Sequence, residues 1–147
     1  MSSIHQAMTT VFDTHSISLS GAQRVISAAL ARAEELDSRV SVVVIDIGGN
    51  VSALARTDGT AATVTTVAQN KANTALTLRS PTDVFAEAIR KDLVLLVTLA
   101  NQPGIALLAG GLPLFYEGAV VGAIGVSGAR DGKDLLIARA GADALDS

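Results

Sequence analysis

The chain has 147 residues and no cysteine, which is enough length for one compact domain and excludes disulfides, thiolate metal ligands and cysteine nucleophiles. Apolar residues make up 49% of the chain but aromatic residues only 3%, so Ala, Val, Leu and Ile must build the core. The net charge is −3 and no run of Lys or Arg occurs, which argues against nucleic-acid binding.

The first half of the chain predicts an arm, a helix and a hairpin. Residues 1–17 are expected to form an N-terminal arm, and residues 18–147 a single domain. The stretch "SGAQRVISAALARAEEL" predicts the first helix, because Ser20 and Gln23 have capping-box spacing and apolar residues recur at helical intervals. The stretch "RVSVVVIDIGGNVSALAR" predicts strands near residues 40–47 and 51–56, joined by a turn at Gly48-Gly49-Asn50.

Two helix starts follow in the middle of the chain. Thr60 is predicted to cap the helix that contains Lys71. Ser80 is predicted to cap the next helix, with Pro81 and Asp83 in its first turn. Residues 92–100, "DLVLLVTLA", fit either a buried helix or a strand.

A second hairpin and a closing helix complete the predicted elements. The stretch "LPLFYEGAVVGAIGVSG" predicts two strands that turn at Glu117-Gly118, and apolar residues at helical intervals predict a helix over residues 137–145. Because hairpins join antiparallel strands, this order excludes a doubly wound parallel sheet. We expect an α+β fold in which helices cover a single antiparallel sheet.

Lys71 is the most unusual residue of the helix "VTTVAQNKANTALTLRS", because it falls on the apolar stripe and not on the polar face. A buried ammonium needs a partner or loses its proton, and either outcome is useful at a site. Lys71 could therefore hold a ligand carboxylate or act as a base or amine nucleophile. Two structural alternatives are an extended side chain that reaches water and an ion pair with an aspartate such as Asp46 or Asp58.

Other polar residues near this helix are candidates for the same site. Asp58 could cap the helix, pair with Arg56 or Lys71, or serve as a general base. Arg79 lies two helical turns beyond Lys71, so the two cations could grip opposite ends of a ligand but could not share one carboxylate. A simple interaction of Arg79 with the helix dipole is the structural alternative.

Glycine-rich loops could supply backbone N–H groups for an anion. Gly110 and Gly111 precede the second hairpin, and Ser127 and Gly128 follow it. Turn geometry and close packing are the alternative explanation for each of these glycines. Neither loop matches a Walker or Rossmann fingerprint.

The two histidines, His5 and His15, both precede the first predicted helix. A loose arm is the simpler expectation for both, and a closed zinc or haem site within one subunit is not favoured. No metal ligand is therefore predicted. A histidine of the arm could still reach the pocket of a neighbouring subunit.

The surroundings of the protein can also be predicted from composition. The N-terminus lacks a basic start and an apolar run, so no signal peptide is expected and the cytoplasm is the predicted location. The apolar runs are too short to cross a bilayer, so no membrane partner is expected. The mean hydropathy of +0.44 is high for one small domain and predicts burial of apolar surface in a homo-oligomer.

Four stretches between residues 40 and 145 resemble the GlcG/HbpS-like family, often labelled haem-degrading, which includes the C-terminal domain of PduO-type proteins, and the resemblance as a whole covers roughly residues 19–145. They are "VSVVVIDIGGNVSALARTDG", "VAQNKANTALTLRSPT", "GGLPLFYEGAVVGAIGVSG" and "DGKDLLIARAGADAL". The resemblance implies a profilin-like antiparallel sheet of about five strands, in a homo-oligomer that is often an octamer. It also implies binding of haem or a corrinoid, or a role in catabolism of small acids, diols or aromatic compounds.

The resemblance can be followed at single residues of this chain. The family's K-A-x-T-A helix matches Lys71, its D-G turn matches Asp58, and its G-G-x-P loop matches Gly110 and Gly111. Its V-G-A-I-G-V-S-G strand ends at Ser127. Haem-binding members are expected to supply a histidine or a comparable polar ligand near the pocket, whereas this chain has no histidine after residue 15.

Three functions are consistent with these features. The first is a small-molecule-binding catabolic protein that acts as a cofactor-independent enzyme on a small organic acid, by isomerisation, hydration or hydrolysis. In it Lys71 and Asp58 would be catalytic, and the ligand-binding residues would be Arg56, Arg79, Gly110, Gly111 and Ser127. The second is a haem- or corrinoid-binding or sensing module, and the third is a structural subunit without a ligand.

Overall fold

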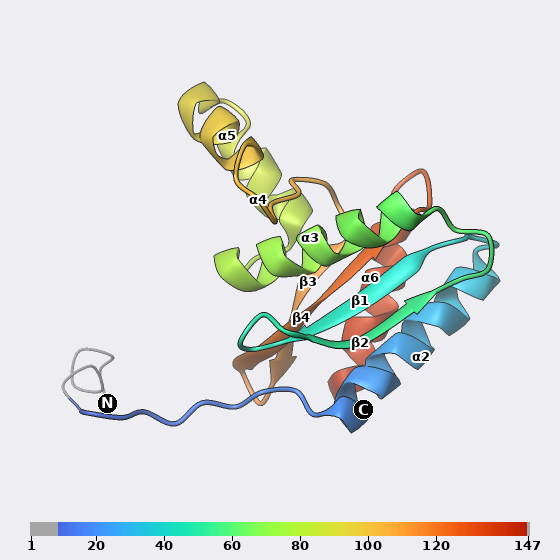
Figure 1. Ribbon diagram of the computed structural model, residues 1–147, viewed down its shortest axis with the longest axis horizontal. Helices are drawn as coiled ribbons and strands as arrows, with labels where there is room; N and C mark the ends of the chain where they lie inside the picture. The colour runs from blue at the N-terminus through green and yellow to red at the C-terminus, as the bar shows by residue number, and fades with distance from the viewer. Residues whose placement is uncertain (1–8, 147) are drawn as a thin grey trace.

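The computed structural model describes residues 9–146, which form one antiparallel sheet between two layers of helices (Figure 1). The sheet has four strands in the order β2-β1-β4-β3, so the expected α+β fold is confirmed with four strands and not about five. The elements in chain order are α2 (Leu19–Glu35), β1 (Ser41–Asp46), β2 (Val51–Arg56), α3 (Ala62–Leu78), α4 (Thr82–Ile89), α5 (Leu93–Ala100), β3 (Gly111–Tyr116), β4 (Ala119–Ser127), α6 (Lys133–Asp143) and the short 3₁₀ helix η1 (Ala144–Asp146).

Both predicted hairpins are present. β1 pairs antiparallel with β2, and β3 pairs antiparallel with β4. The second hairpin turns at Glu117 and Gly118, which both have positive φ, at 49° and 81°. β1 also pairs antiparallel with β4, and this pairing joins the two hairpins into one sheet.

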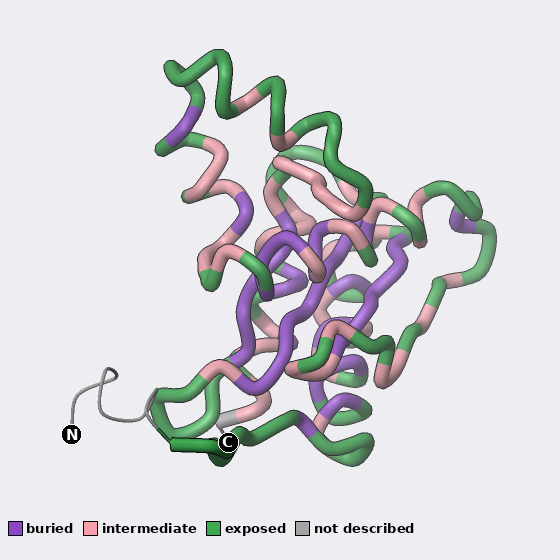
Figure 2. The backbone as a smooth tube through the Cα atoms, turned by 60° about the vertical axis from the view of Figure 1, so that its left-hand side comes forward, coloured by how far each residue is buried: buried purple, intermediate pink, exposed green. Residues whose placement is uncertain are grey.

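Alternate residues of β1 face the two helical layers, as the period of an extended strand requires. Val42 and Val44 pack in the larger core, together with residues of α2 and α6. Val43 and Ile45 face the other way and pack against alanines of α3. The buried parts of the backbone tube lie along the sheet and the inner faces of these helices (Figure 2). The aliphatic core predicted from composition is therefore built as two layers, one on each face of the sheet.

α3 lies so close to β4 that a glycine is needed between them. A Cβ atom added to Gly125 would collide with the backbone oxygen of Ala68 and lie 2.6 Å from the backbone nitrogen of Ala72. The side chains of α3 that face the sheet are mainly alanines, which permits the same close approach. This contact sets the position of α3, and hence of Lys71, relative to the sheet.

Three predicted helix caps differ from those in the structure. Ser18, and not Ser20, caps α2, because the Ser18 hydroxyl accepts a hydrogen bond from the Gly21 N–H at 3.0 Å. Ala61 and Pro81 occupy the N-cap positions of α3 and α4 without any side-chain cap. The side chains predicted to cap them bond elsewhere: the Thr60 hydroxyl lies 2.8 Å from the Thr57 hydroxyl, and the Ser80 hydroxyl donates to the Pro81 carbonyl.

Residues 93–100 form the helix α5, which resolves the ambiguity left by the sequence in favour of a helix. The helix does not lie in the interior of the chain, however, because its residues are all exposed or half-buried. α4 and α5 project together from the sheet-and-helix body (Figure 1). None of the helices within residues 9–146 has the length and hydropathy that a membrane crossing needs.

Candidate functional site

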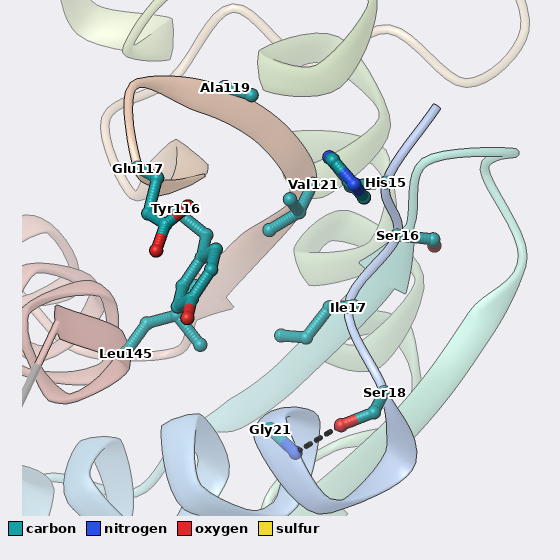
Figure 3. A pocket seen from close by; sticks show the side chains of 10 residues that line it. All are labelled: His15, Ser16, Ile17, Ser18, Gly21, Tyr116, Glu117, Ala119, Val121 and Leu145. Carbon is teal, nitrogen blue, oxygen red and sulfur yellow. Dashed lines mark hydrogen bonds between the residues drawn. The ribbon is translucent and has the colours of Figure 1, made fainter. Parts of the chain in front are cut away.

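A cavity of about 540 Å³ lies where the arm meets the second hairpin, and we call it the arm cavity. Its lining residues come from the arm, the start of α2, the turn between β3 and β4, and η1 (Figure 3). They are His15, Ser16, Ile17, Ser18, Gly21, Tyr116, Glu117, Ala119, Val121 and Leu145. This volume lies in the range of small-molecule sites, about 300–1,000 Å³.

Residues 16 and 17 of the arm are fixed to the domain, and this attachment positions His15. The Ile17 N–H donates to the Val121 carbonyl at 2.9 Å, and the Ile17 side chain is 8% exposed. The Ser16 hydroxyl accepts a hydrogen bond from the Ile47 N–H at 3.1 Å. His15 therefore directly precedes a segment that is hydrogen-bonded both to β4 and to the turn that follows β1.

The floor of the arm cavity is apolar and its rim is polar. Ile17 and Val121 are almost fully buried, whereas His15, Tyr116 and Glu117 are exposed. Figure 3 shows Val121 between the side chains of His15 and Tyr116. An imidazole, a phenol and a carboxylate around an apolar floor suit a ligand with an apolar body and one atom that accepts a nitrogen ligand or a hydrogen bond.

Lys71 is buried but lines neither the arm cavity nor the second cavity described below. Its Nζ donates to the Val126 carbonyl at 2.9 Å and to Oδ2 of Asp134 at 3.1 Å. The other carboxylate oxygen of Asp134 accepts from the Ala129 N–H at 2.9 Å. Since α3 and α6 cover opposite faces of the sheet, this ion pair links the two helical layers. Of the alternatives considered for Lys71, the structure shows the structural ion pair. The partner is Asp134, however, and not Asp46 or Asp58.

Gly110 and Gly111 are required by this packing. A Cβ atom on Gly110 would lie 2.5 Å from the Val126 oxygen and 3.1 Å from the Lys71 Nζ. One on Gly111 would collide with the backbone oxygen of Lys71. The Gly111 N–H already donates to the Thr82 hydroxyl at 3.0 Å, so the geometry favours close packing over the expected anion cradle.

Arg56 and Asp58 lie together, but away from Lys71. Both line a second cavity of about 340 Å³ between α2 and β2, whose other lining residues are Leu30, Ala33, Glu34, Ser38, Ala55 and Thr57. Arg56 donates to the Thr60 carbonyl at 2.5 Å, and Asp58 is exposed. The carboxylate that pairs with Lys71 is that of Asp134 and not that of Asp58, so a catalytic role of Asp58 stays a prediction.

The remaining predicted site residues, Arg79 and Ser127, line neither of the two cavities. Arg79 is exposed at the C-terminal end of α3, in a left-handed conformation with φ of 52°. Ser127 is 8% exposed and ends β4, where it lies opposite Ser41 of β1. A role for either in ligand binding stays a prediction.

His15, Tyr116 and Glu117 were not predicted as site residues. His15 belongs to a segment without periodicity, and the other two residues were interpreted only as parts of a hairpin. A signal was present, because the tyrosine is the only one in the chain and adjoins a predicted turn. Among the residues that the structure describes, no group of three or more His, Cys, Asp or Glu residues could hold a metal ion.

Comparisons with known proteins agree with the fold and with the motifs noted in the sequence. A family model described as "Haem degrading protein HbpS-like" matches residues 17–143. An uncharacterized 15.0 kDa protein of Citrobacter freundii is 36% identical over 128 residues, which cover 86% of this chain and 90% of that protein. Protein GlcG of Escherichia coli K12 is 34% identical over 106 residues, or 72% of this chain and 77% of GlcG. The crystal structure of a double mutant of Streptomyces reticuli HbpS superposes with a TM-score of 0.84 at 36% identity and covers 93% of this chain and 92% of that one.

Proposed function

Since the chain belongs to the HbpS-like family, we propose that it is a cytoplasmic small-molecule-binding protein that takes up haem or a related tetrapyrrole in the arm cavity. The observation that carries this proposal is the position of His15, which lies on the polar rim of a cavity of about 540 Å³ with an apolar floor. Imidazole is a common axial ligand of haem iron. The description of the family, which names haem degradation, supports the same ligand class.

The residues of the arm cavity fit such a ligand in two respects. The buried side chains of Ile17 and Val121 offer an apolar surface to the macrocycle, and the ring of Tyr116 offers a flat one beside them. The floor would also keep water from that side of the ligand. No Lys or Arg lines the cavity, so the propionates of a haem would have to face solvent. His15 would hold the iron of a bound haem, and the iron would supply redox or ligand-binding chemistry at this position.

His15→Ala is expected to weaken haem binding by at least about tenfold, because it removes the iron ligand and leaves only apolar contacts. The measurement is a titration with haemin, followed by the Soret band. His5→Ala is the matched control, because it removes the only other histidine, which lies outside the described residues. Wild-type protein without a Soret shift, or equal affinity of the His15→Ala protein, would contradict the proposal.

A second candidate function is catalysis of a reaction of a small organic acid. The observation in its favour is that Arg56 and Asp58 line the same cavity. Arg56 would hold a substrate carboxylate, and Asp58 would act as general base. Lys71 could join them only if its ion pair with Asp134 opened, because its side chain is 3% exposed. A catalytic role of Lys71 therefore stays a prediction.

The second candidate predicts that short carboxylates such as glycolate raise the thermal midpoint of the protein. At a hundredfold excess over the dissociation constant the rise should be about 5 °C or more. Arg56→Ala should abolish it, and Arg130→Ala, which removes another exposed arginine, should not. A rise that survives in the Arg56→Ala protein would place the ligand elsewhere.

A further inference from the structure

The second cavity is lined by charged side chains of both signs, and they do not pair with one another. Glu34 belongs to α2, Arg56 ends β2, and Asp58 lies in the turn that follows β2. The helix and the strand lie side by side (Figure 1). The salt bridges found within residues 9–146 all join other residues, so neither carboxylate is within ion-pair distance of the Arg56 guanidinium. Charges of both signs are therefore available to a ligand in this cavity.

The floor of the second cavity is apolar. Ala33 is fully buried, and Leu30 and Ala55 are half-buried against the same core. The Ser38 hydroxyl also lines the cavity, but it already donates to the Leu36 carbonyl at 3.1 Å. The charged side chains are thus the main groups with which a polar ligand could interact, and the aliphatic floor suits an apolar side chain of that ligand.

Arg56 and Asp58 are held at fixed backbone positions by hydrogen bonds around one turn. The Thr60 N–H donates to the Thr57 carbonyl at 3.1 Å, which closes the turn that contains Asp58. The Thr57 hydroxyl accepts a hydrogen bond from the Val40 N–H at 2.9 Å. Arg56 donates to the Thr60 carbonyl, but a guanidinium has five N–H donors and so keeps others for a ligand carboxylate. The turn therefore presents a cation and an anion to the same cavity.

We propose that the second cavity binds a small α-amino acid with an aliphatic side chain. Arg56 donates to the carboxylate of the amino acid, and Glu34 and Asp58 accept hydrogen bonds from its ammonium group. The aliphatic side chain lies on the apolar floor. This inference rests on the second candidate function, whose cavity and arginine it uses, and it narrows the small organic acid to an amino acid. The volume of about 340 Å³ is within the range of small-molecule sites.

The charge balance of the cavity favours an amino acid over a simple acid or a simple amine. Two acidic residues line it against one basic residue. A ligand with a carboxylate alone is attracted by Arg56 but repelled by Glu34 and Asp58. A ligand with an amine alone is attracted by the two carboxylates but repelled by Arg56. A ligand that carries both charges has a partner for each, and unpaired charges of this kind are a source of specificity against the other two ligand classes.

Three ligands of similar shape test the proposal by isothermal titration calorimetry at pH 7. L-Valine carries both charges, isovalerate lacks the ammonium group, and isobutylamine lacks the carboxylate. We expect L-valine to bind at least about fivefold more tightly than either analogue, because each analogue loses a charge-assisted hydrogen bond. Equal affinity of L-valine and either analogue would overturn the inference. If none of the three binds, the inference falls as well, whereas the response to glycolate decides the second candidate function separately.

A matched pair of variants locates the binding site. Asp58→Asn keeps the size of the side chain but removes its charge, so it should weaken L-valine binding at least about fivefold without weakening the binding of isovalerate. Asp131→Asn, which removes another exposed carboxylate, should leave both affinities unchanged. Far-ultraviolet circular dichroism checks that both variants are folded. An Asp58→Asn protein that binds L-valine like the wild type, or that loses both ligands equally, would contradict the assigned role. Neither measurement depends on haem or on the arm cavity.

Discussion

Replacing Gly125 by alanine is expected to lower the free energy of unfolding by at least about 3 kcal/mol. The added Cβ atom would collide with the Ala68 carbonyl and lie 2.6 Å from the Ala72 nitrogen, so the backbone of α3 itself would have to move. Extra atoms in a packed core usually cost about 1–3 kcal/mol, and a collision with backbone is at the upper end because no side chain can rotate away. Urea unfolding measures the change.

Gly49→Ala is the control for Gly125→Ala. Gly49 has a positive φ of 84°, but its added Cβ would meet nothing within 4 Å. Its cost should therefore be only that of the strained backbone, roughly 1–2 kcal/mol. Equal costs at the two positions would mean that α3 does not lie as close to β4 as described.

Replacing Lys71 by methionine is expected to lower the free energy of unfolding by about 3 kcal/mol. The substitution leaves the Asp134 carboxylate, whose side chain is 14% exposed, beside an apolar side chain, and it leaves the Val126 carbonyl without its lysine donor. Removing one partner of a buried ion pair typically costs about 3–5 kcal/mol. The partial exposure of Asp134 places the expected value at the lower end.

A double-mutant cycle separates the ion pair from other effects of the methionine. Asp134→Asn removes the charge but keeps an oxygen that can accept the hydrogen bond from the Ala129 N–H. In the Lys71→Met background it should cost less than in the wild type, by at least about 1 kcal/mol. Additive costs would show that the two residues do not interact. A loss of ligand binding in the Lys71→Met protein is therefore informative only if the variant is still folded.

The fold could largely be predicted from the sequence because its signals are local. The turn at Gly48-Gly49-Asn50 and the alternating strands around it identified the first hairpin, and the turn at Glu117-Gly118 identified the second. The apolar run of residues 93–97 was harder, because periodicity alone cannot distinguish a buried strand from a short helix that is apolar on most sides. The two hairpins predicted the antiparallel sheet, whereas the family resemblance supplied the expected number of about five strands, and the sheet has four.

The candidate site could be predicted only in part, because its residues meet through tertiary structure. The position of Lys71 on the apolar side of its helix correctly indicated burial, which the structure confirms at 2% exposure. Its partner could not be identified, since Asp134 is 63 residues away and belongs to a helix on the other face of the sheet. The position of the arm beside the cavity involves a backbone hydrogen bond between Ile17 and Val121. A sequence pattern does not predict a single hydrogen bond between two distant segments.

The position of the iron in a crystal of the haem-loaded protein tests the central claim most directly. Diffraction data collected at the iron absorption edge would locate the metal without any assumption about the ligand's orientation. We expect an anomalous peak in the arm cavity within coordination distance of the His15 imidazole. A peak beside Lys71 and Asp134, in the cavity that Arg56 and Asp58 line, or at any place away from His15 would contradict the account.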